Sequence, residues 1–293
     1  MSIITVDNHE IELSNENKIL FPKSKITKGD LINYYWSIAP IMLTHVREHP
    51  IAMQRFPDGI THEGFYQKNK DDYFPRWIDS VAIKRKSDAH AVYYVVCNNS
   101  ATLVYLANQA VITMHLLLGT VGKLRYPDRL VFDLDPVQVP LSVLVDTAHQ
   151  IKKLVEKYGL TPFVMTTGSK GLHVIMPLKQ KNTFKQVRMF AQKIAREVIE
   201  KNPNQVTLEI RKEKRIGKVF IDILRNQPVQ HAVAPYSVRP IEGAPVAMPL
   251  AWSEIAHLKN FAQTFTIGNV ATHLKKHGDA WRNFDSAAAV LKV

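Results

Sequence analysis

Two acidic residues at the end of a short apolar run constrain this chain more than any other feature of its sequence. Residues 130–132 read Leu-Val-Phe, which predicts a buried strand, and Pro136 is expected to end it. Asp133 and Asp135 stand between them, and side chains two residues apart on a strand project from the same face. Such a pair of like charges requires a cation, a bound proton or a basic side chain nearby. Carboxylate oxygens suit a divalent metal, so the pair predicts a metal site.

A glycine-bordered polar loop follows further along the chain. Residues 163–177 read as a strand, a tight loop and a second strand. Gly168 and Gly171 let the backbone turn with its N–H groups pointing inward, which suits a phosphate. The spacing differs from that of a Walker A loop, which also continues directly into a helix. The loop adds two hydroxyl groups and a cation, from Thr167, Ser169 and Lys170.

A third acidic residue, Asp222, lies within the apolar strand expected at residues 218–226. A charged side chain in such a strand is rarely left without a partner. If Asp222 pairs across the sheet with Asp133 and Asp135, three carboxylates converge. Together they could hold one or two metal ions beside a loop that binds a triphosphate.

The charge balance of the chain favours an anionic partner. Its 293 residues include 38 Lys and Arg against 26 Asp and Glu, which leaves a formal net charge of +12. This sign is typical of proteins that bind nucleic acid or an anionic membrane surface, although many basic proteins simply remain soluble this way. With 46% hydrophobic and 22% charged residues, the chain is expected to be globular.

The same composition excludes several classes of protein. Cys97 is the only cysteine, so neither an intrachain disulfide nor a cysteine-based zinc site is expected. The first residues lack the basic and apolar regions of a secretory signal, and no apolar run approaches the roughly 20 residues of a membrane-spanning helix. We therefore expect a cytoplasmic protein with no membrane partner.

In order, spacing and context, these motifs resemble the archaeo-eukaryotic primase superfamily. Within it, they are most similar to the polymerase domain of bacterial ligase D, a primase-polymerase of non-homologous end joining, in its stand-alone form. The resemblance is strongest over residues 10–255, and Thr167 stands where the family usually has Ser. It rests on four segments, at residues 133–136, 167–173, 221–226 and 234–239.

The resemblance implies a fold of the α/β (α+β) class. It has central β-sheets that form an active-site cleft flanked by helices. Residues 1–293 are expected to form a single catalytic domain, with residues 256–293 as C-terminal helices that pack on it.

The resemblance also implies an activity, the addition of nucleotides to a 3′-hydroxyl at gaps and double-strand breaks. Two divalent ions, Mn2+ or Mg2+, would be held by the three catalytic residues Asp133, Asp135 and Asp222. The family implies Mn2+ and a preference for ribonucleotides over deoxyribonucleotides, with either NTP or dNTP as substrate. The sequence has no Lys-x-Asp-Gly signature, so no ligase activity is expected.

Matching positions of the family assign further residues to the nucleotide. His115 stands just upstream of the Asp-x-Asp strand. A lone His on an apolar strand is usually a core residue, but the match favours a role near the metal or nucleotide. The full set expected to bind the nucleotide is His115, Thr167, Ser169, Lys170, His173, Arg225 and Arg239.

Two lysines flank the start of the first long helix. Thr27 is the expected N-cap of that helix, with Asp30 completing a capping box. Taken alone, Lys18 and Lys28 are most simply two solvated side chains. In the family, lysines in these contexts recognise the 5′-phosphate of a broken or gapped strand. Two ammonium groups beside a helix N-terminus suit that dianion.

Other residues are expected to contact the DNA template or its ends. Phe65 and Tyr66 are adjacent, so one ring should face outward, where it could stack on an unpaired base. The family uses such a pair near the template and an arginine, here Arg55, near the end junction. The densest basic run, residues 211–218, precedes the Asp222 strand, and its Arg215 and Lys218 are expected to contact phosphates.

The expected partners are DNA with 5′-phosphorylated ends or gaps, a Ku-like end-binding protein and a ligase on another polypeptide. We expect a monomer, or two copies across a DNA break, associated with the nucleoid of a bacterium or archaeon. The same residues leave two alternatives open. Three carboxylates and a histidine also suit a metal-dependent nuclease or phosphodiesterase, and the basic surface alone would suit a non-catalytic DNA-end-binding protein.

Overall fold

The computed structural model describes residues 2–84, 90–258 and 264–292. Its contacts divide the chain into two compact units, each built around its own six-stranded sheet. The prediction of a single catalytic domain stays a prediction. Unit 1 is formed within Met1–Leu117, His231–Ala247 and Phe265–Lys276, and unit 2 within Leu118–Gln230, Met248–Thr264 and His277–Val293.

The sheet of unit 1 is antiparallel, in the strand order β15-β9-β5-β8-β7, with β6 paired to β5. Two short hairpins, β1-β2 and β3-β4, complete the strands of this unit. Strand bounds are β1 Ser2–Val6, β2 His9–Leu13, β3 Ile19–Phe21, β4 Ile26–Thr27, β5 Pro50–Arg55, β6 Phe65–Gln67, β7 Ser80–Ile83, β8 Val92–Val96, β9 Val111–Leu117 and β15 His231–Val233.

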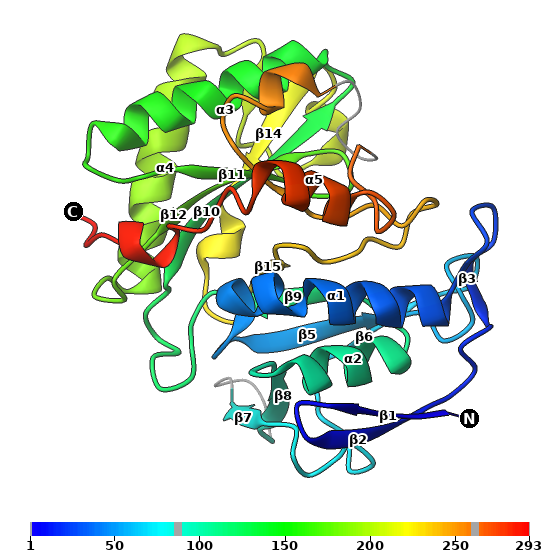
Figure 1. Cartoon of the computed structure of the whole chain (residues 1–293). Coiled ribbons are helices and arrows are strands. Elements are labelled where there is room, and N and C mark those ends of the chain that lie inside the picture. The colour runs from blue at the N-terminus through cyan, green and yellow to red at the C-terminus, as the bar shows by residue number, and fades with distance from the viewer. Residues whose placement is uncertain (1, 85–89, 259–263, 293) are drawn as a thin grey trace. The chain divides into compact units, whose positions relative to one another are not determined.

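Helices α1 (Lys28–Val46) and α2 (Ser100–Asn108) pack against each other in unit 1 (Figure 1). The predicted capping box is confirmed, because Thr27 Oγ1 accepts a hydrogen bond from Asp30 N and the Asp30 carboxylate accepts one from Thr27 N. The buried Tyr35 hydroxyl donates to the Ile112 carbonyl of β9 at 2.7 Å. This bond ties α1 to the sheet and gives the buried hydroxyl group of Tyr35 a hydrogen-bond partner.

The sheet of unit 2 has the order β13-β14-β10-β12-β11-β16, and only β13 runs parallel to its neighbour. Helices α3 (Leu141–Glu156) and α4 (Phe184–Lys201) pack against each other and on β10 (Figure 1). Strand bounds are β10 Arg129–Val137, β11 Phe163–Thr166, β12 Leu172–Pro177, β13 Val206–Thr207, β14 Lys218–Asp222 and β16 Pro249–Leu250.

Alternation along β10 places three of its apolar residues on the face opposite its two acidic ones. Leu130, Phe132 and Leu134 are fully buried and project from one face of the sheet. Their face meets the apolar stripes of α3 and α4, which leaves Asp133 and Asp135 on the opposite face. The prediction of a buried strand that carries two carboxylates on one side is therefore confirmed.

The prediction that Pro136 ends its strand was wrong. Pro136 does not end β10, which continues to Val137. Beyond Leu134 the strand is paired only with β14, and a strand with one open side tolerates a residue that lacks an N–H group.

No helix in the described part of the chain is both long and apolar enough to cross a membrane.

The segment 256–293 is not the series of helices that was predicted. Among its described residues the only α-helix is α5 (Val270–His277), and residues 259–263 lie outside the described part of the chain. In unit 2, Trp281 is buried and stacks on Phe284 with their ring centroids 5.0 Å apart. Buried aromatic side chains such as Trp281 therefore hold this part of the segment in unit 2 without a long helix. Short 3-10 turns occur at Ile255–His257 and Asp285–Ala287.

Gly171 is required for the turn between β11 and β12. A Cβ atom there would lie 2.1 Å from the Leu134 carbonyl oxygen, which is backbone and cannot rotate away. We predict that Gly171→Ala lowers the free energy of unfolding by about 1–3 kcal/mol, the usual cost of overpacking. Denaturant titration measures this change.

Gly268→Ala is the matched control, because a Cβ at Gly268 meets nothing closer than 3.7 Å. Its effect should stay within about 0.5 kcal/mol. Equal stability of the two variants would show that the backbone approach at Gly171 is not tight.

Candidate active site

A row of polar side chains crosses three adjacent strands of unit 2. In the antiparallel register, Asp133 of β10 lies opposite His173 of β12 on one side and opposite Asp222 of β14 on the other. Directly paired residues project from the same face, and Asp135 joins them because it lies two residues beyond Asp133. Asp222 does pair across the sheet with Asp133, and His173 lies in the same row. That the three carboxylates together hold a metal stays a prediction.

Asp133 is in direct contact with two basic side chains at this row. His173 Nε2 lies 3.3 Å from Asp133 Oδ1, with both side chains buried. Arg225 Nε donates to Asp133 Oδ2 at 3.1 Å and lies 3.6 Å from Asp222 Oδ2. The other oxygen of Asp222 accepts a hydrogen bond from Leu224 N at 2.7 Å. The guanidinium group therefore bridges two of the three acids.

Asn226 holds the turn that presents Arg225. Its side-chain amide donates to the Val131 carbonyl at 2.7 Å and accepts from Val131 N at 2.9 Å. This pair of bonds ties the 3-10 turn Leu224–Asn226 to β10 in the manner of a neighbouring strand. Sequence reasoning did not assign this role to Asn226. The signal available was its place at the end of the matched motif.

Burial and unequal neighbours separate the pKa values of the three acids. Burial raises the pKa of Asp133, but His173 and Arg225 outweigh it and lower the value to about 2. Burial, followed by the negative charge of Asp133, raises the pKa of Asp135 to about 6. Burial also raises the pKa of Asp222, against the opposing charge of Arg225. The row carries more negative charge than its basic residues neutralise.

These residues have the chemistry of a divalent metal site. Three carboxylates offer hard oxygen ligands on one face of a sheet. Burial first, and then the neighbouring negative charge of Asp133, raises the pKa of Asp135, so a nearby cation would favour its ionised form. As the side chains stand, no three acidic, His or Cys residues in the described ranges already surround a common point. Arg225 lies between Asp133 and Asp222, so coordination by both acids requires its guanidinium group to shift.

The loop after β11 places its polar groups at the end of this row. Thr167 N donates to the Gly171 carbonyl at 3.0 Å, and Thr167 Oγ1 accepts from Ser169 N and Gly171 N at 3.3 and 3.2 Å. Gly168 has φ of +65°, which favours glycine. Lys170 is exposed, whereas the hydroxyl group of Thr167 is turned into the loop. Direct contact of Thr167 with a nucleotide stays a prediction.

A second polar group lies in unit 1. His115 of β9 packs against Tyr66 and His231, with ring centroids 5.6 and 5.1 Å away. Arg239 Nη1 lies 3.5 Å from His115 Nε2. The structure thus brings His115 and Arg239 together, as their common assignment to the nucleotide requires. His231 was missed, because only the pairing of β15 with β9 reveals that it is a neighbour of His115.

The two lysines predicted to bind a 5′-phosphate differ in their surroundings. Lys18 is exposed and pairs with Asp58 at 2.7 Å. Lys28 is buried, and its Nζ donates to Ser14 Oγ and the Asn108 carbonyl at 3.1 and 3.0 Å. Burial lowers the pKa of Lys28. A pocket of about 660 Å3 lies beside them, lined by Leu13, Asn15, Glu16, Asn17 and Lys18.

In unit 1, the side chain of Arg55 is held by neighbouring side chains. It donates to Gln67 Oε1 and the Tyr73 hydroxyl, both at 2.7 Å, and its guanidinium carbon lies 5.6 Å from the centre of the Phe65 ring. Phe65 and Tyr66 are 47% and 50% exposed, so both rings face outward rather than one. Among the described strands, β6 pairs with β5 alone, so one of its edges is unpaired.

Arg215, just before β14, and Lys218, its first residue, also form local contacts in unit 2. Arg215 Nε donates to the Glu209 carbonyl at 2.7 Å, and its guanidinium carbon lies 3.5 Å from the centre of the Phe220 ring. Lys218 Nζ donates to the Pro203 carbonyl at 2.9 Å. Their contacts with DNA phosphates stay predictions.

Comparison with known proteins identifies relatives of this arrangement. The chain is 31% identical to the multifunctional non-homologous end joining protein LigD of Mycolicibacterium smegmatis, over 96% of the chain and 37% of that protein. It is 31% identical to the bifunctional non-homologous end joining protein LigD of Bacillus subtilis, over 94% of the chain and 44% of that protein. The chain therefore spans less than half the length of these relatives.

A solved structure has the same fold. The polymerase domain of Mycobacterium tuberculosis ligase D, determined in complex with DNA, matches with a TM-score of 0.88 and 28% identity, over 95% of this chain and 99% of that one. This match confirms the predicted α/β (α+β) primase-polymerase fold. The family described as the LigD primase-polymerase domain matches residues 27–281. The chain therefore belongs to the LigD primase-polymerase domain family, a family of nucleotidyltransferases.

Proposed function

We propose that this chain is a DNA-end-repair polymerase. It would add nucleotides to a 3′-hydroxyl at gaps and double-strand breaks during non-homologous end joining. The observation that carries the proposal is the alignment of Asp133, Asp135 and Asp222 on one sheet face, beside His173 and the Gly171 turn. The names of the relatives and the DNA in the neighbouring structure support the pathway and the substrate.

Different residues of unit 2 would bind the metal ions and the triphosphate. Asp133, Asp135 and Asp222 would hold divalent ions, and we propose two, with Mn2+ preferred over Mg2+. Such ions lower the pKa of the attacking hydroxyl group and neutralise the leaving pyrophosphate. Lys170, Ser169 and the loop backbone would hold the triphosphate, with Arg225 as a second cation.

His173 contributes a further polar atom. Its Nε2 faces Asp133, while its Nδ1 is buried and has no hydrogen-bond partner in the described part of the chain. A buried polar atom without a partner is rare unless a ligand or water completes it. We propose that a triphosphate oxygen or its bound water does so. His115 and Arg239 of unit 1 are also proposed to contact a nucleotide. Ribonucleotides are the proposed preferred substrates.

The pocket beside Lys18 is proposed to recognise the 5′-phosphate of the downstream strand. Its volume admits a terminal phosphate and sugar, and Lys28 lies in the first turn of α1, where the helix dipole also favours an anion. The proposed partners beyond DNA are a Ku-like end-binding protein and a ligase. We propose a monomer that acts alone at gaps and as two copies across a break.

The proposed activity is tested with a gapped, 5′-phosphorylated duplex, Mn2+ and ribonucleotides. The protein should extend the 3′-end, and Asp135→Asn should slow extension by roughly a hundredfold or more, since it removes a charged ligand while preserving shape. Asp146→Asn, an exposed position on α3, is the control and should extend at the normal rate. Strand shortening would identify a nuclease instead, and binding without any reaction would identify an end-binding protein.

The metal site is tested without any reaction. In chelator at pH 7.5, Asp135→Asn should raise the free energy of unfolding by roughly 1–2 kcal/mol, because it removes a carboxylate that is ionised at a cost. The folded-state pKa of about 6 lies above the ordinary value. The gain should therefore be complete above pH 6 and absent below about pH 4, where the wild-type side chain is protonated in both states.

Millimolar Mn2+ should reverse the order of stability, because ligands that bind only the folded state stabilise it. The wild type should gain stability on addition of Mn2+, whereas Asp135→Asn should gain little. A thermal unfolding series with and without metal provides the measurement. A wild type that is indifferent to both Mn2+ and Mg2+ would exclude the metal site.

The 5′-phosphate pocket is tested by Lys28→Met, which keeps the buried stem and removes the charge. The preference for a phosphorylated over an unphosphorylated gap should fall by about tenfold, the effect of one charged hydrogen bond. Fluorescence anisotropy with the two duplexes measures the ratio of affinities. Lys23→Met, an exposed lysine outside the pocket, should keep the preference. An unchanged ratio in Lys28→Met would place the phosphate elsewhere.

A further inference from the structure

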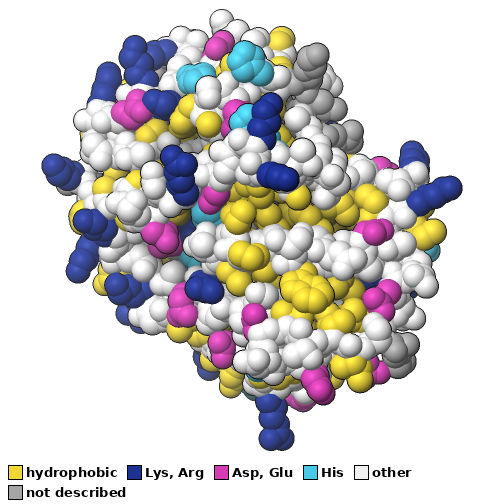
Figure 2. Space-filling view, in the orientation of Figure 1, with side chains coloured by type: hydrophobic (Ala, Val, Ile, Leu, Met, Phe, Trp, Pro, Cys, Tyr) yellow, Lys and Arg dark blue, Asp and Glu magenta, His cyan; other side chains and the backbone are white. Residues whose placement is uncertain are grey.

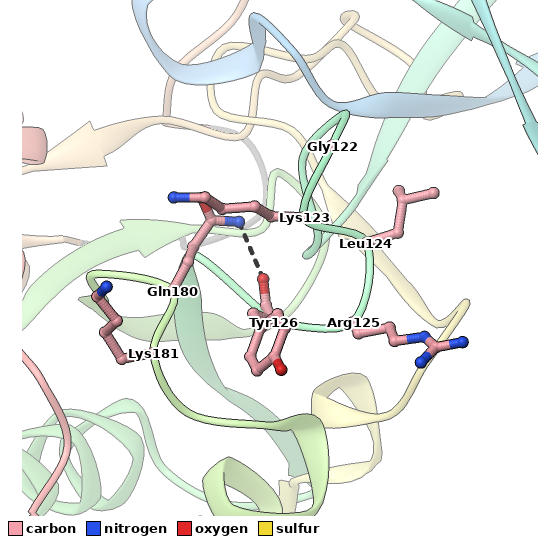
Figure 3. A pocket seen from close by; sticks show the side chains of 7 residues that line it. All are labelled: Gly122, Lys123, Leu124, Arg125, Tyr126, Gln180 and Lys181. Carbon is pink, nitrogen blue, oxygen red and sulfur yellow. Dashed lines mark hydrogen bonds between the residues drawn. The ribbon is translucent and has the colours of Figure 1, made fainter.

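A basic pocket in unit 2 lies apart from the row of carboxylates. Its volume is about 600 Å3, and it is lined by Gly122, Lys123, Leu124, Arg125, Tyr126, Gln180 and Lys181 (Figure 3). The lining comes from two segments, the connection that leads into β10 and the one that leaves β12. A concave site of this size fits a small molecule or a short polymer segment.

The pocket is held open by backbone and side-chain bonds rather than by flexible contacts. Gln180 Nε2 donates to the Tyr126 carbonyl at 2.9 Å (Figure 3). It also donates to Thr120 Oγ1 at 3.0 Å, and the two bonds join the two segments. Gly119 is needed for the fold-back, because a Cβ there would lie 2.8 Å from the Leu124 carbonyl oxygen. A preformed pocket loses little entropy when it binds a ligand.

The charges of the pocket are all positive. Lys123, Arg125 and Lys181 are exposed, and none of the three forms an ion pair with a carboxylate in the described ranges. The neighbouring acid, Asp128, is paired with Arg129 at 2.8 Å. Lys and Arg side chains are otherwise dispersed over the face shown in Figure 2, so net charge alone does not locate a binding surface. The three cations that line this one pocket do indicate a binding surface for an anion.

Tyr126 adds an aromatic surface to these cations. Its side chain is 38% exposed, and its backbone is fixed by the bond from Gln180. In Figure 3 the side chains of Lys123 and Lys181 extend to the same side of Tyr126, and that of Arg125 to the other. Cations that flank an exposed ring are the usual means of holding single-stranded nucleic acid, because phosphates pair with the cations and a base stacks on the ring.

The register of the sheet separates this pocket from the proposed reaction site. Arg129 pairs with Pro177 at one end of the β10–β12 ladder, and the Gly171 turn lies at the other. Asp133 is four residues beyond Arg129, a distance of about 13 Å along the strand. The pocket lies beyond Arg129, so it cannot contact the reacting phosphate. It can contact a strand that continues away from the site.

We propose that this pocket binds a single-stranded stretch of nucleic acid. Phosphates would lie on Lys123, Lys181 and Arg125, and a base would stack on Tyr126. The inference extends the proposed function, because a broken DNA end carries such a stretch. It differs from the contacts expected at Arg55, Phe65 and Tyr66, which lie in unit 1.

Binding of a fluorescent oligothymidylate of about ten nucleotides tests the proposal by anisotropy over a range of salt concentrations. Lys123→Glu combined with Lys181→Glu should weaken binding about tenfold. Two lost phosphate contacts should also reduce the slope of log affinity against log salt by about 1.4. Tyr126→Ala should weaken binding about tenfold by removing the stacking surface, whereas Tyr126→Phe should bind normally.

The charge-matched control is Lys153→Glu with Lys185→Glu, two exposed positions on the helices that cover the opposite face of the sheet. Equal losses in this control and in the pocket variant would mean a general charge effect and would overturn the proposal. Unchanged oligothymidylate binding in the pocket variant, with loss of binding to an oligoglutamate, would assign the pocket to acidic peptides and also overturn it. Every variant should still extend a gapped duplex without single-stranded tails, so failure of the wild type to extend would count against the proposed function alone.

Discussion

The candidate site depends on the antiparallel register of β10 with its two neighbours. Asp133 lies in one row with His173 and Asp222 because the three strands pair at these residues. A slip of one residue would turn every side chain of β10 to the other face and send both carboxylates into the helices. The fully buried Leu130, Phe132 and Leu134 prevent that slip, since exposing them would lose several kcal/mol of apolar burial. The packing of the core therefore also fixes the positions of the acidic side chains.

This arrangement leaves an excess of negative charge at the centre of the sheet. Arg225 bridges Asp133 and Asp222, but the pKa of Asp135 remains raised to about 6. A buried charge without a full complement of partners destabilises the folded state. A cation bound as proposed would offset this cost, and the excess negative charge would favour its binding. Arg225, which contacts both Asp133 and Asp222, offsets part of the cost within the chain itself.

Features written in local sequence were predictable, and features created by long-range pairing were not. The capping box at Thr27, the alternation around Asp133 and the tight turn at Gly171 each follow from neighbouring residues. The approach of His231 to His115 follows only from the pairing of β15 with β9. Likewise the final segment follows its anchors, such as Trp281, and not its helical propensity. Burial of Lys28 had no local signal either.

In the loop after β11, the hydroxyl group of Thr167 is already engaged within the chain. Thr167 was expected to offer its hydroxyl group to a triphosphate, but that oxygen accepts bonds from the N–H groups of Ser169 and Gly171. Two of the inward N–H groups are therefore already satisfied within the loop. The capacity left for an anion is the Lys170 ammonium group and the remaining backbone. A Ser at this position could accept the same two bonds, so Thr167 keeps the internal hydrogen bonding of the loop unchanged. The proposed contact with a phosphate would then rest on the ammonium group of Lys170 and on the N–H groups that remain.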